Sequence, residues 1–262
     1  MDDSLLINAL SWAREAGAVH RRYFRGRELD IKAKLNESDI VTAADKAAEK
    51  LVISHIRETY PEHSILSEES GAEAHGSQYR WVIDPLDGTT NFSQGLPLYS
   101  ISIGIEKDGE TVAGVVYDSY LDELFHAVKG EGAFLNGEPI TVSGKQVLNE
   151  SVVATGFPVD KHLTPDNNLD NVSRVMPKVR GLRRLGSAAM DLCYVAAGFL
   201  DGYWEMNLYP WDVCAGLLIV KEAGGEFTHF RNDRNISVVA GTPAIHKELV
   251  ELLSAEPFKG SR

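Results

Sequence analysis

The chain has 262 residues and a formal net charge of −12; 44% of its residues are hydrophobic and 24% are charged. This balance is ordinary for a globular protein with a large core, and it excludes a disordered chain. So acidic a protein does not favour nucleic acid as a main partner, because phosphate backbones are bound by clustered Lys and Arg.

The N-terminus, Met1-Asp-Asp-Ser4, is acidic and lacks the basic start and apolar run of a signal peptide. No apolar stretch approaches the roughly 18 residues of a membrane span. Cys193 and Cys214 lie in apolar surroundings, without the spacing of a disulfide framework, and are interpreted as small core residues. We therefore expect a cytoplasmic protein with no membrane partner.

The first half of the chain predicts two helices and an antiparallel sheet. Apolar residues at helical spacing predict helices from Ser4 to about Phe24 and from about Thr42 to Thr59. Short strands are expected at residues 64–68 and 80–84, the second ending abruptly at Pro85. Strands joined by Gly-containing turns then predict an antiparallel meander: 99–105, 111–117, 124–128 and a continuation through 129–137.

Beyond about residue 145, strands alternate with helices. Strands are expected at residues 151–155 and 202–206, and helices at 163–178, 187–197 and 211–222. This alternation predicts a layered α/β region. The expected organisation is an α+β region, residues 1–145, and an α/β region, residues 146–262, packed as one compact unit.

The most informative segment is residues 81–92, Trp-Val-Ile-Asp-Pro-Leu-Asp-Gly-Thr-Thr-Asn-Phe. A strand delivers Asp84, Pro85 fixes a turn, and Asp87 follows three residues later. Carboxylates and a free carbonyl at one spot are the hard oxygen ligands that suit Mg²⁺.

Gly88 allows close approach of the backbone to a ligand, and the two threonines that follow suit the capping of a short helix. Amides at the start of a helix suit phosphate, so the same loop is expected to hold both metal and phosphate. Asp-Pro and Asp-Gly alone are ordinary turn sequences. The complete string favours the functional interpretation.

This string closely resembles the signature of the inositol monophosphatase family, Trp-x-Ile-Asp-Pro-x-Asp-Gly-Thr-x-Asn-Phe. Residues 39–45 match the family's Asp-x-Val-Thr-x-x-Asp segment, and residues 67–70 match its Glu-Glu-Ser element. Downstream, residues 186–189, Glu205 and residues 211–216 match its C-terminal signature. The resemblance extends over most of the chain.

The resemblance implies individual roles. Magnesium, two or three ions per active site, would be ligated by five residues: Glu68, Asp84, Leu86 through its carbonyl, Asp87 and Asp212. The catalytic residues would be Thr89, Asp45 and Glu68, the first two orienting or activating the attacking water. Eight residues would bind the substrate: Asp87, Gly88, Thr89, Gly186, Ser187, Ala188, Glu205 and Asp212.

Several of these residues also have a structural interpretation. Asp45 could lie on a helix surface, Glu68 in a solvated acidic turn, and Asp212 at the start of a helix, where its charge is favourable. Glu205 lies in an apolar strand, where an unpaired carboxylate is costly. Lys34 is either a surface lysine or a partner of the carboxylates.

The expected function is magnesium-dependent hydrolysis of inositol monophosphate by a metal-activated water, with inhibition by lithium. The resemblance also implies a layered αβαβα architecture and a homodimer. The alternatives are a fructose-1,6-bisphosphatase, a nucleotide 3′-phosphatase, a histidinol-phosphate phosphatase and a non-catalytic regulatory protein on the same fold. Zinc, kinase and dehydrogenase motifs do not occur in the sequence.

Overall fold

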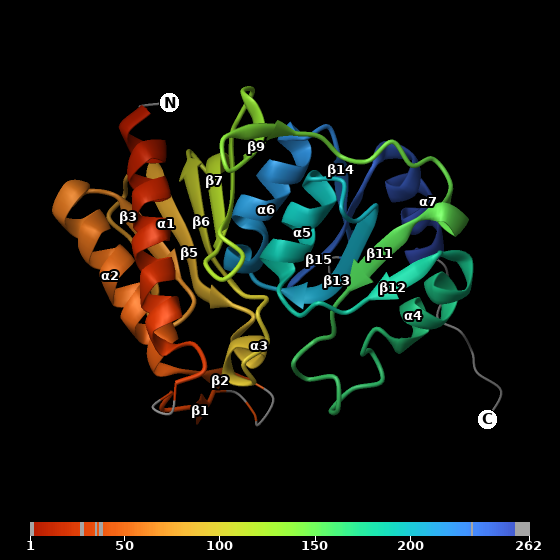
Figure 1. Cartoon of the computed structure of the whole chain (residues 1–262), viewed down its shortest axis with the longest axis horizontal. Coiled ribbons are helices and arrows are strands. Elements are labelled where there is room, and N and C mark those ends of the chain that lie inside the picture. The colour runs from red at the N-terminus through yellow and green to blue at the C-terminus, as the bar shows by residue number, and fades with distance from the viewer. Residues whose placement is uncertain (1–2, 27–28, 35, 37–38, 232, 255–262) are drawn as a thin grey trace.

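The computed structural model describes residues 3–26, 29–34, 36, 39–231 and 233–254. Figure 1 shows five layers in order: an outer pair of helices, a large sheet, a central pair of helices, a second sheet, and helices on its far side. This arrangement confirms the predicted layered αβαβα class. Residues 35, 37 and 38, within the segment upstream of Asp39, lie outside the described residues.

The outer layer consists of α1 (Asp3–Tyr23) and α2 (Ala43–Thr59), as the sequence predicts. Helix α1 buries a stripe that includes Leu5, Ala9 and Trp12 against α2 and the first sheet. Thr42 caps α2, which ends before Pro61.

The first sheet has, within the described residues, eight strands in the order β10-β9-β8-β7-β6-β5-β3-β4. Their bounds are β3 (Ser64–Ser67), β4 (Gly71–Glu73), β5 (Tyr79–Asp87), β6 (Ser100–Lys107), β7 (Glu110–Asp118), β8 (Glu123–Val128), β9 (Gly132–Leu135) and β10 (Glu138–Ile140). Strands β6 to β9 form the predicted antiparallel meander, β5 and β10 extend it at its two ends, and β3 lies parallel to β5. A separate ribbon pairs β1 (Lys32–Ala33) with β2 (Ile40–Val41).

The prediction that β5 ends at Pro85 is wrong. The strand continues to Asp87, which pairs with Ser100 after a shift in register that begins at Asp84. A proline removes one ladder donor but is accommodated at such an irregularity. The strand pairs with β6 before and after this irregularity, at Asp84 and at Asp87. Both residues are therefore held on a rigid sheet rather than on a free loop.

The second sheet has, within the described part of the chain, five strands in the order β12-β11-β13-β15-β14. The bounds are β11 (Val152–Thr155), β12 (Gly181–Arg183), β13 (Gly202–Leu208), β14 (Glu226–Arg231) and β15 (Ile236–Gly241). Strand β11 is parallel to its neighbours, whereas β13, β15 and β14 are antiparallel. The sheet is therefore mixed, and β12, β14 and β15 were not predicted.

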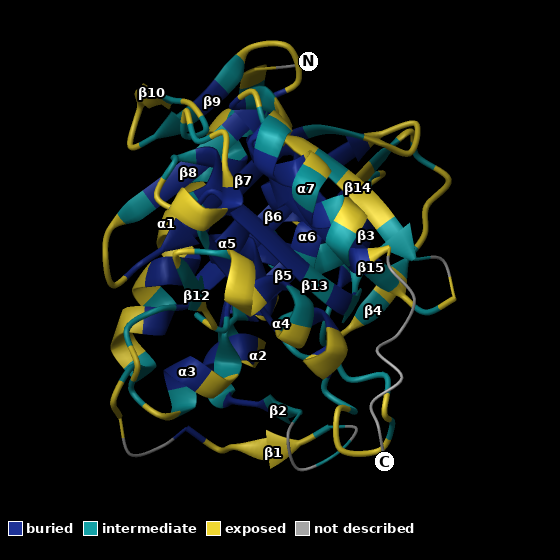
Figure 2. Ribbon diagram, turned by 90° about the vertical axis from the view of Figure 1, so that its right-hand side faces the viewer, coloured by how far each residue is buried: buried dark blue, intermediate teal, exposed yellow. Residues whose placement is uncertain are grey.

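Helices α5 (Ala188–Ala196) and α6 (Pro210–Glu222) lie between the sheets, and Figure 2 shows this centre as buried. A Cβ atom at Gly104 would lie 2.3 Å from Cys214 Sγ, and one at Gly114 would lie 2.8 Å from Ala215 Cα. The glycines let α6 approach the sheet closely. Both cysteines are buried and free, which confirms them as core residues.

The helix predicted over residues 163–178 is wrong in extent. The structure has α4 (Leu169–Val175), followed by the 3-10 turn η2 (Met176–Lys178). Asn168 has φ of 76° and directs its amide to Gly156 O and Thr155, so the preceding residues form a loop. The remaining elements are α3 (Thr89–Ser93), η1 (Leu148–Glu150) and α7 (Pro243–Leu253). None of the helices among the described residues is long and apolar enough to cross a membrane.

Candidate active site

The loop between β5 and α3 turns at Gly88, which has φ of 89° and is the N-cap of α3. Thr89 is thus the first residue of the helix, and the prediction that its side chain caps the helix is wrong. A Cβ at Gly88 would lie 3.1 Å from Leu98 O and 3.3 Å from Gly186 O. Glycine here supplies a left-handed conformation and brings the loop against residue 186, at the substrate side of the site.

Four of the predicted metal ligands lie in one electrostatic environment. Asp84 is only 2% exposed. Burial raises the pKa of Asp84 well above its ordinary value, and the nearby charges of Glu68, Asp87 and Asp212 raise that pKa further. The structure therefore brings together carboxylates from β5, from the turn after β3 and from the start of α6.

Each of these carboxylates is hydrogen bonded to protein. Asp84 Oδ1 accepts a hydrogen bond from Leu86 N at 3.0 Å, and Asp212 Oδ2 accepts one from Tyr209 N at 2.7 Å. The latter bond completes a capping box, so the helix-start interpretation of Asp212 is correct as well. Asp87 Oδ2 accepts from the Ser187 hydroxyl at 2.6 Å and from Ala189 N at 2.7 Å.

Glu68 pairs with the predicted partner lysine. Lys34 Nζ lies 2.8 Å from Glu68 Oε1 and also contacts Glu69. Burial lowers the pKa of Lys34, but the two carboxylates outweigh burial and hold the pKa above its usual value. Lys34 is thus a cation placed within the acidic site, and its interpretation as a surface lysine is wrong.

Within the described chain, no three His, Cys, Asp or Glu side chains are already arranged as a metal-binding group. The chemistry of the donors nevertheless fits Mg²⁺, since the site offers carboxylate oxygens and the Leu86 carbonyl. The negative charges that raise the pKa of Asp84 repel one another, and a bound divalent cation would offset this repulsion. Lys34 is bonded to Oε1 of Glu68, so the second carboxylate oxygen of Glu68 remains available as a ligand.

Thr89 and Asp45 lie beside this set. Thr89 Oγ1 lies 3.0 Å from Asp45 Oδ1 and 2.9 Å from Leu86 O, both of which are acceptors. Asp45 Oδ2 accepts from the backbone and hydroxyl of Thr42, in the capping box of α2. Burial raises the pKa of Asp45 to about 6, against the hydrogen bonds from Thr42 and Thr89. Asp45 is completely buried, so its interpretation as a surface carboxylate is wrong.

Glu205 projects from β13 on the opposite side of the site, and Tyr203 donates its hydroxyl to Glu205 Oε2 at 2.6 Å. Burial raises the pKa of Glu205 to about 7, while the bond from Tyr203 and the charge of Arg184 lower it. The predicted contact residues Gly186, Ser187 and Ala188 stand at the start of α5, where Ser187 is the N-cap. The hydrogen bond from Ser187 to Asp87 joins this group to the end of β5, which carries the predicted metal ligands Asp84 and Asp87.

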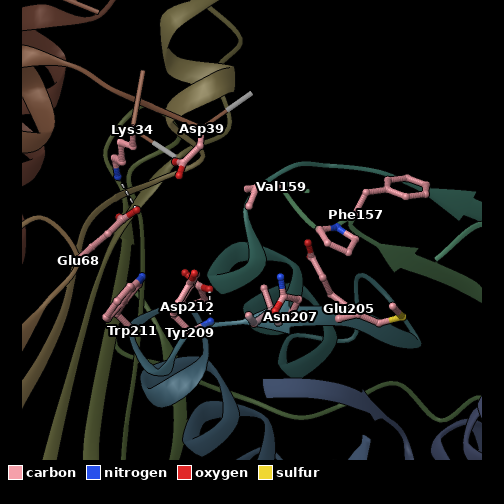
Figure 3. Close-up of a pocket in the computed structure, with 13 residues that line it drawn as sticks. Lys34, Asp39, Glu68, Phe157, Val159, Glu205, Asn207, Tyr209, Trp211 and Asp212 are labelled. Carbon is pink, nitrogen blue, oxygen red and sulfur yellow. Dashed lines mark hydrogen bonds and ion pairs between the residues drawn. The ribbon is translucent and has the colours of Figure 1, made fainter. Parts of the chain in front are cut away.

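A cavity of about 370 Å³ lies between the two halves of the chain (Figure 3). Its walls contain the predicted residues Glu68, Asp212 and Glu205, together with Lys34 and Asp39. The other lining residues are Phe157, Pro158, Val159, Met206, Asn207, Leu208, Tyr209 and Trp211. The cavity thus opens from the acidic site toward Glu205, as a place for the alcohol part of an ester requires.

Sequence reasoning missed three residues that support the site. Asn91 Nδ2 donates to Leu98 O at 2.9 Å and to Leu185 O at 2.8 Å; the residue lies in the conspicuous string but was given no role. Glu49 accepts from the backbone of Glu69, and His20 Nε2 lies 2.8 Å from Pro85 O. Nothing in the local sequence around Glu49 or His20 indicates these contacts.

Comparisons with known proteins show the family and agree with the fold. Residues 1–257 match the model of the inositol monophosphatase family. A protein named Nus factor SuhB, from Pasteurella multocida (strain Pm70), is 44% identical over 252 residues, which cover 94% of each chain. An inositol-1-monophosphatase from Mesorhizobium japonicum is 40% identical over 258 residues, which cover 96% of this chain and 97% of that protein. The solved structure of inositol monophosphatase from Anabaena (Nostoc) sp. PCC 7120 superposes with a TM-score of 0.86 at 39% identity, covering 98% of both chains.

Proposed function

This chain belongs to the inositol monophosphatase family, and on that premise we propose that it hydrolyses inositol monophosphate to inositol and phosphate in a magnesium-dependent reaction. The observation that carries the proposal is the enclosed set of carboxylates around Asp84, beside the Thr89–Asp45 pair. Burying like charges destabilises a metal-free protein, whereas bound cations neutralise them. The cluster of carboxylates is therefore explained by a cation-binding function.

In this proposal, magnesium is held by Glu68, Asp84, Asp87, Asp212 and the Leu86 carbonyl, as two or three ions. Bound there, it supplies positive charge for the phosphate and lowers the pKa of a coordinated water. The fit rests on the chemistry of the donors and on their shared environment.

Thr89 and Asp45 orient the attacking water. The Thr89 hydroxyl donates to Asp45, which leaves its lone pairs free to accept a hydrogen bond from the water. Asp45, with a pKa of about 6, is largely ionised at neutral pH and accepts a proton through the hydroxyl. Glu68, the third proposed catalytic residue, faces the same cavity.

The substrate lies across both sides of the site. Backbone amides of Gly88 and Thr89 hold the phosphate beside Asp87 and Asp212. Gly186, Ser187 and Ala188 contact the alcohol part, and the Glu205 carboxylate accepts hydrogen bonds from its hydroxyl groups. The relative from Mesorhizobium japonicum that is named an inositol-1-monophosphatase supports this choice of substrate.

The same proposal includes inhibition by lithium, a homodimer and a cytoplasmic location. Fructose 1,6-bisphosphate, a nucleotide 3′-phosphate and histidinol phosphate are the competing substrates. Each presents a phosphate monoester to the same carboxylates, so the alcohol side of the cavity must discriminate among them.

The relative named Nus factor SuhB favours one second candidate, a regulatory protein on the same fold that binds a macromolecular partner. The two functions are separable by variants at the carboxylates. Asp84→Asn removes a proposed metal ligand and leaves the surface unchanged, so a purely regulatory protein keeps its cellular role in that variant.

The test of the main proposal is a panel of phosphate esters with and without Mg²⁺. It contains inositol 1-phosphate, fructose 1,6-bisphosphate, histidinol phosphate and phosphoadenosine phosphate. The highest kcat/KM is expected for inositol 1-phosphate, and only with Mg²⁺. A higher kcat/KM for another ester would overturn the assignment of inositol 1-phosphate as the substrate. Absence of turnover on every ester would overturn the assignment of phosphatase activity.

A further inference from the structure

We propose that Arg234, supported by Arg231, is a positioning residue that determines which alcohols the cavity accepts. It acts by holding the loop of residues 156–168, hereafter the wall loop, against the open side of the cavity. The inference rests on the proposed phosphatase function and assigns a specificity role to residues outside its metal and phosphate sites.

The wall loop forms the apolar side of the cavity. Phe157, Pro158 and Val159 line it, and Figure 3 shows Phe157 and Val159 on the side away from Glu68 and Lys34. The first residue of the loop, Gly156, packs against Glu205: a Cβ at Gly156 would lie 2.0 Å from the Glu205 carboxylate. A displacement of the wall loop therefore changes the space beside Glu205.

The two ends of the wall loop are fixed by a buried polar network. Asn168 Nδ2 donates to Gly156 O at 2.6 Å and to Thr155 Oγ1 at 2.9 Å. Trp204 Nε1 donates to Asn168 Oδ1 at 2.8 Å, and Thr155 Oγ1 donates to Trp204 O at 2.7 Å. These buried bonds set where the loop leaves β11 and where it enters α4.

The middle of the wall loop has little apolar anchorage. Lys161 and His162 are exposed, and Leu163 is 72% exposed. A loop with few buried apolar contacts opens locally at low cost unless polar contacts hold it. Besides a bond of 3.3 Å from Asn36 Nδ2 to Val159 O, its position depends on the charged groups that it presents to its neighbours.

Arg234 holds the loop at two points. Its Nη2 donates to Asp160 Oδ2 at 2.6 Å, and its Nη1 donates to Asp166 O at 2.9 Å and to Asp166 Oδ2 at 3.2 Å. Arg231 Nη1 adds a bond of 2.6 Å to Asp166 Oδ1. Arg231 is the last residue of β14, and Arg234 lies between β14 and β15, so the second sheet clamps the loop.

Burial and geometry make this clamp stronger than an ordinary surface ion pair. The side chains of Arg234 and Arg231 are 18% and 23% exposed, so solvent screens them only in part. A planar guanidinium can bind two acceptors in fixed directions, whereas a lysine ammonium is a point charge. Lysine at position 234 is expected to hold the loop only partly.

The wall and Glu205 together define a substrate class. An apolar surface facing a carboxylate suits a cyclic polyol, whose C–H face packs on Phe157 and Val159 while its hydroxyls donate to Glu205. A short acyclic alcohol has no ring face to pack on the wall loop. Loss of the clamp should therefore raise KM for inositol 1-phosphate and leave KM for glycerol 2-phosphate unchanged.

The experiment compares Arg234→Gln, Arg234→Lys and Asp160→Asn with wild type, all as purified full-length protein with Mg²⁺. For Arg234→Gln we expect KM for inositol 1-phosphate to rise about 10-fold, kcat to stay within about 2-fold, and KM for glycerol 2-phosphate to stay within about 2-fold. Arg234→Lys should lie between this variant and wild type. The double variant Arg234→Gln/Asp160→Asn should be no worse than the more affected single variant, because both break one clamp.

The control variant is Arg80→Gln, which breaks a pair with Glu106 near the start of β5, away from the wall loop. It should leave both KM values unchanged. A second measurement does not use turnover: trypsin should cleave after Lys161 about 10-fold faster in Arg234→Gln than in wild type or Arg80→Gln, because the loop opens more often.

Equal effects of Arg234→Gln on the two esters, or an unchanged KM for inositol 1-phosphate, would overturn the inference while leaving the proposed function in place. Unchanged cleavage after Lys161 would overturn the clamp itself. If wild type hydrolyses neither ester, the proposed function fails, and the proteolysis comparison alone then decides whether Arg234 holds the loop.

Discussion

Thr89 Oγ1 lies 3.0 Å from Asp45 Oδ1, which joins the loop after β5 to the first turn of α2, 44 residues earlier in the chain. The same carboxyl group accepts both hydrogen bonds from Thr42 that fix the start of α2. One buried carboxylate therefore ties a helix start to the hydroxyl that is proposed to orient the water. Its position depends on a capping box and not on a flexible side chain.

Thr89→Ala should lower kcat for inositol 1-phosphate about 100-fold to 10,000-fold, because the hydroxyl that orients the water is removed. The Mg²⁺ concentration for half-maximal activity should change less than about 3-fold, since Thr89 contributes no proposed side-chain ligand. Thr89→Ser should recover most of kcat, and Thr90→Ala, at the exposed neighbouring position, is the control. A large shift in the Mg²⁺ requirement of Thr89→Ala would contradict this role.

Asp84→Asn should abolish magnesium binding without weakening the metal-free fold. The asparagine oxygen can still accept from Leu86 N, and the repulsion from Glu68, Asp87 and Asp212 is relieved. At pH 8 the metal-free variant should be more stable than wild type by about 1 kcal/mol in denaturant unfolding. The increase in Tm on adding Mg²⁺ should be present in wild type and in Asp170→Asn, at an exposed position on α4, but lost in Asp84→Asn. If Mg²⁺ still raises the Tm of Asp84→Asn, Asp84 is not a ligand of the metal.

Glu205→Gln should raise KM for inositol 1-phosphate about 10-fold, because an acceptor for substrate hydroxyls is weakened. Burial raises the pKa of Glu205 to about 7, so its carboxylate forms as the pH rises through 7. In wild type, KM should therefore fall between pH 6 and pH 8, whereas in Glu205→Gln this fall should disappear. Tyr203→Phe, which removes the hydrogen bond to Glu205, should move the fall to higher pH. The same pH profile of KM in Glu205→Gln and wild type would show that another group causes it.

His20 should make the fold acid-sensitive. Burial lowers the pKa of His20 from 6.5 to about 4, so the unfolded chain binds a proton more readily than the folded one between these values. The resulting stability is complete above pH 6.5 and is lost as the pH falls toward 4, by about 3 kcal/mol. His20→Gln keeps a donor for Pro85 O but does not titrate, so its free energy of unfolding should fall less between pH 6.5 and pH 4. His162→Gln, at an exposed position, should retain the wild-type dependence. Parallel curves for His20→Gln and wild type would contradict the assignment.

The loop of residues 81–92 was predictable because its chemistry is local. Carboxylates, a proline, a glycine and threonines follow one another within a few positions, and the residues alone indicate a metal and phosphate site. The strands and helices that carry Glu205 and Asp212 were also predictable from periodicity. The structure brings these segments together as the resemblance implied.

The apolar wall could not be predicted in this way. Phe157 and Val159 line the cavity on a loop whose Asp166 and Asp160 pair with Arg231 and Arg234, 65 and 74 residues later. Pairings of such long range leave no periodic signal in the sequence. The error in predicting where β5 ends has a related cause. The pairing of Asp87 with β6 outweighs the local tendency of Pro85 to end a strand.

The most direct test of the central claim is the release of inorganic phosphate from inositol 1-phosphate by wild type and by Asp84→Asn, each treated with a chelator and then supplied with Mg²⁺. Wild type should be inactive after chelation and recover on addition of Mg²⁺, while Asp84→Asn should stay at least about 1,000-fold lower in kcat/KM. Turnover that survives chelation, or an Asp84→Asn variant as active as wild type, would contradict the account.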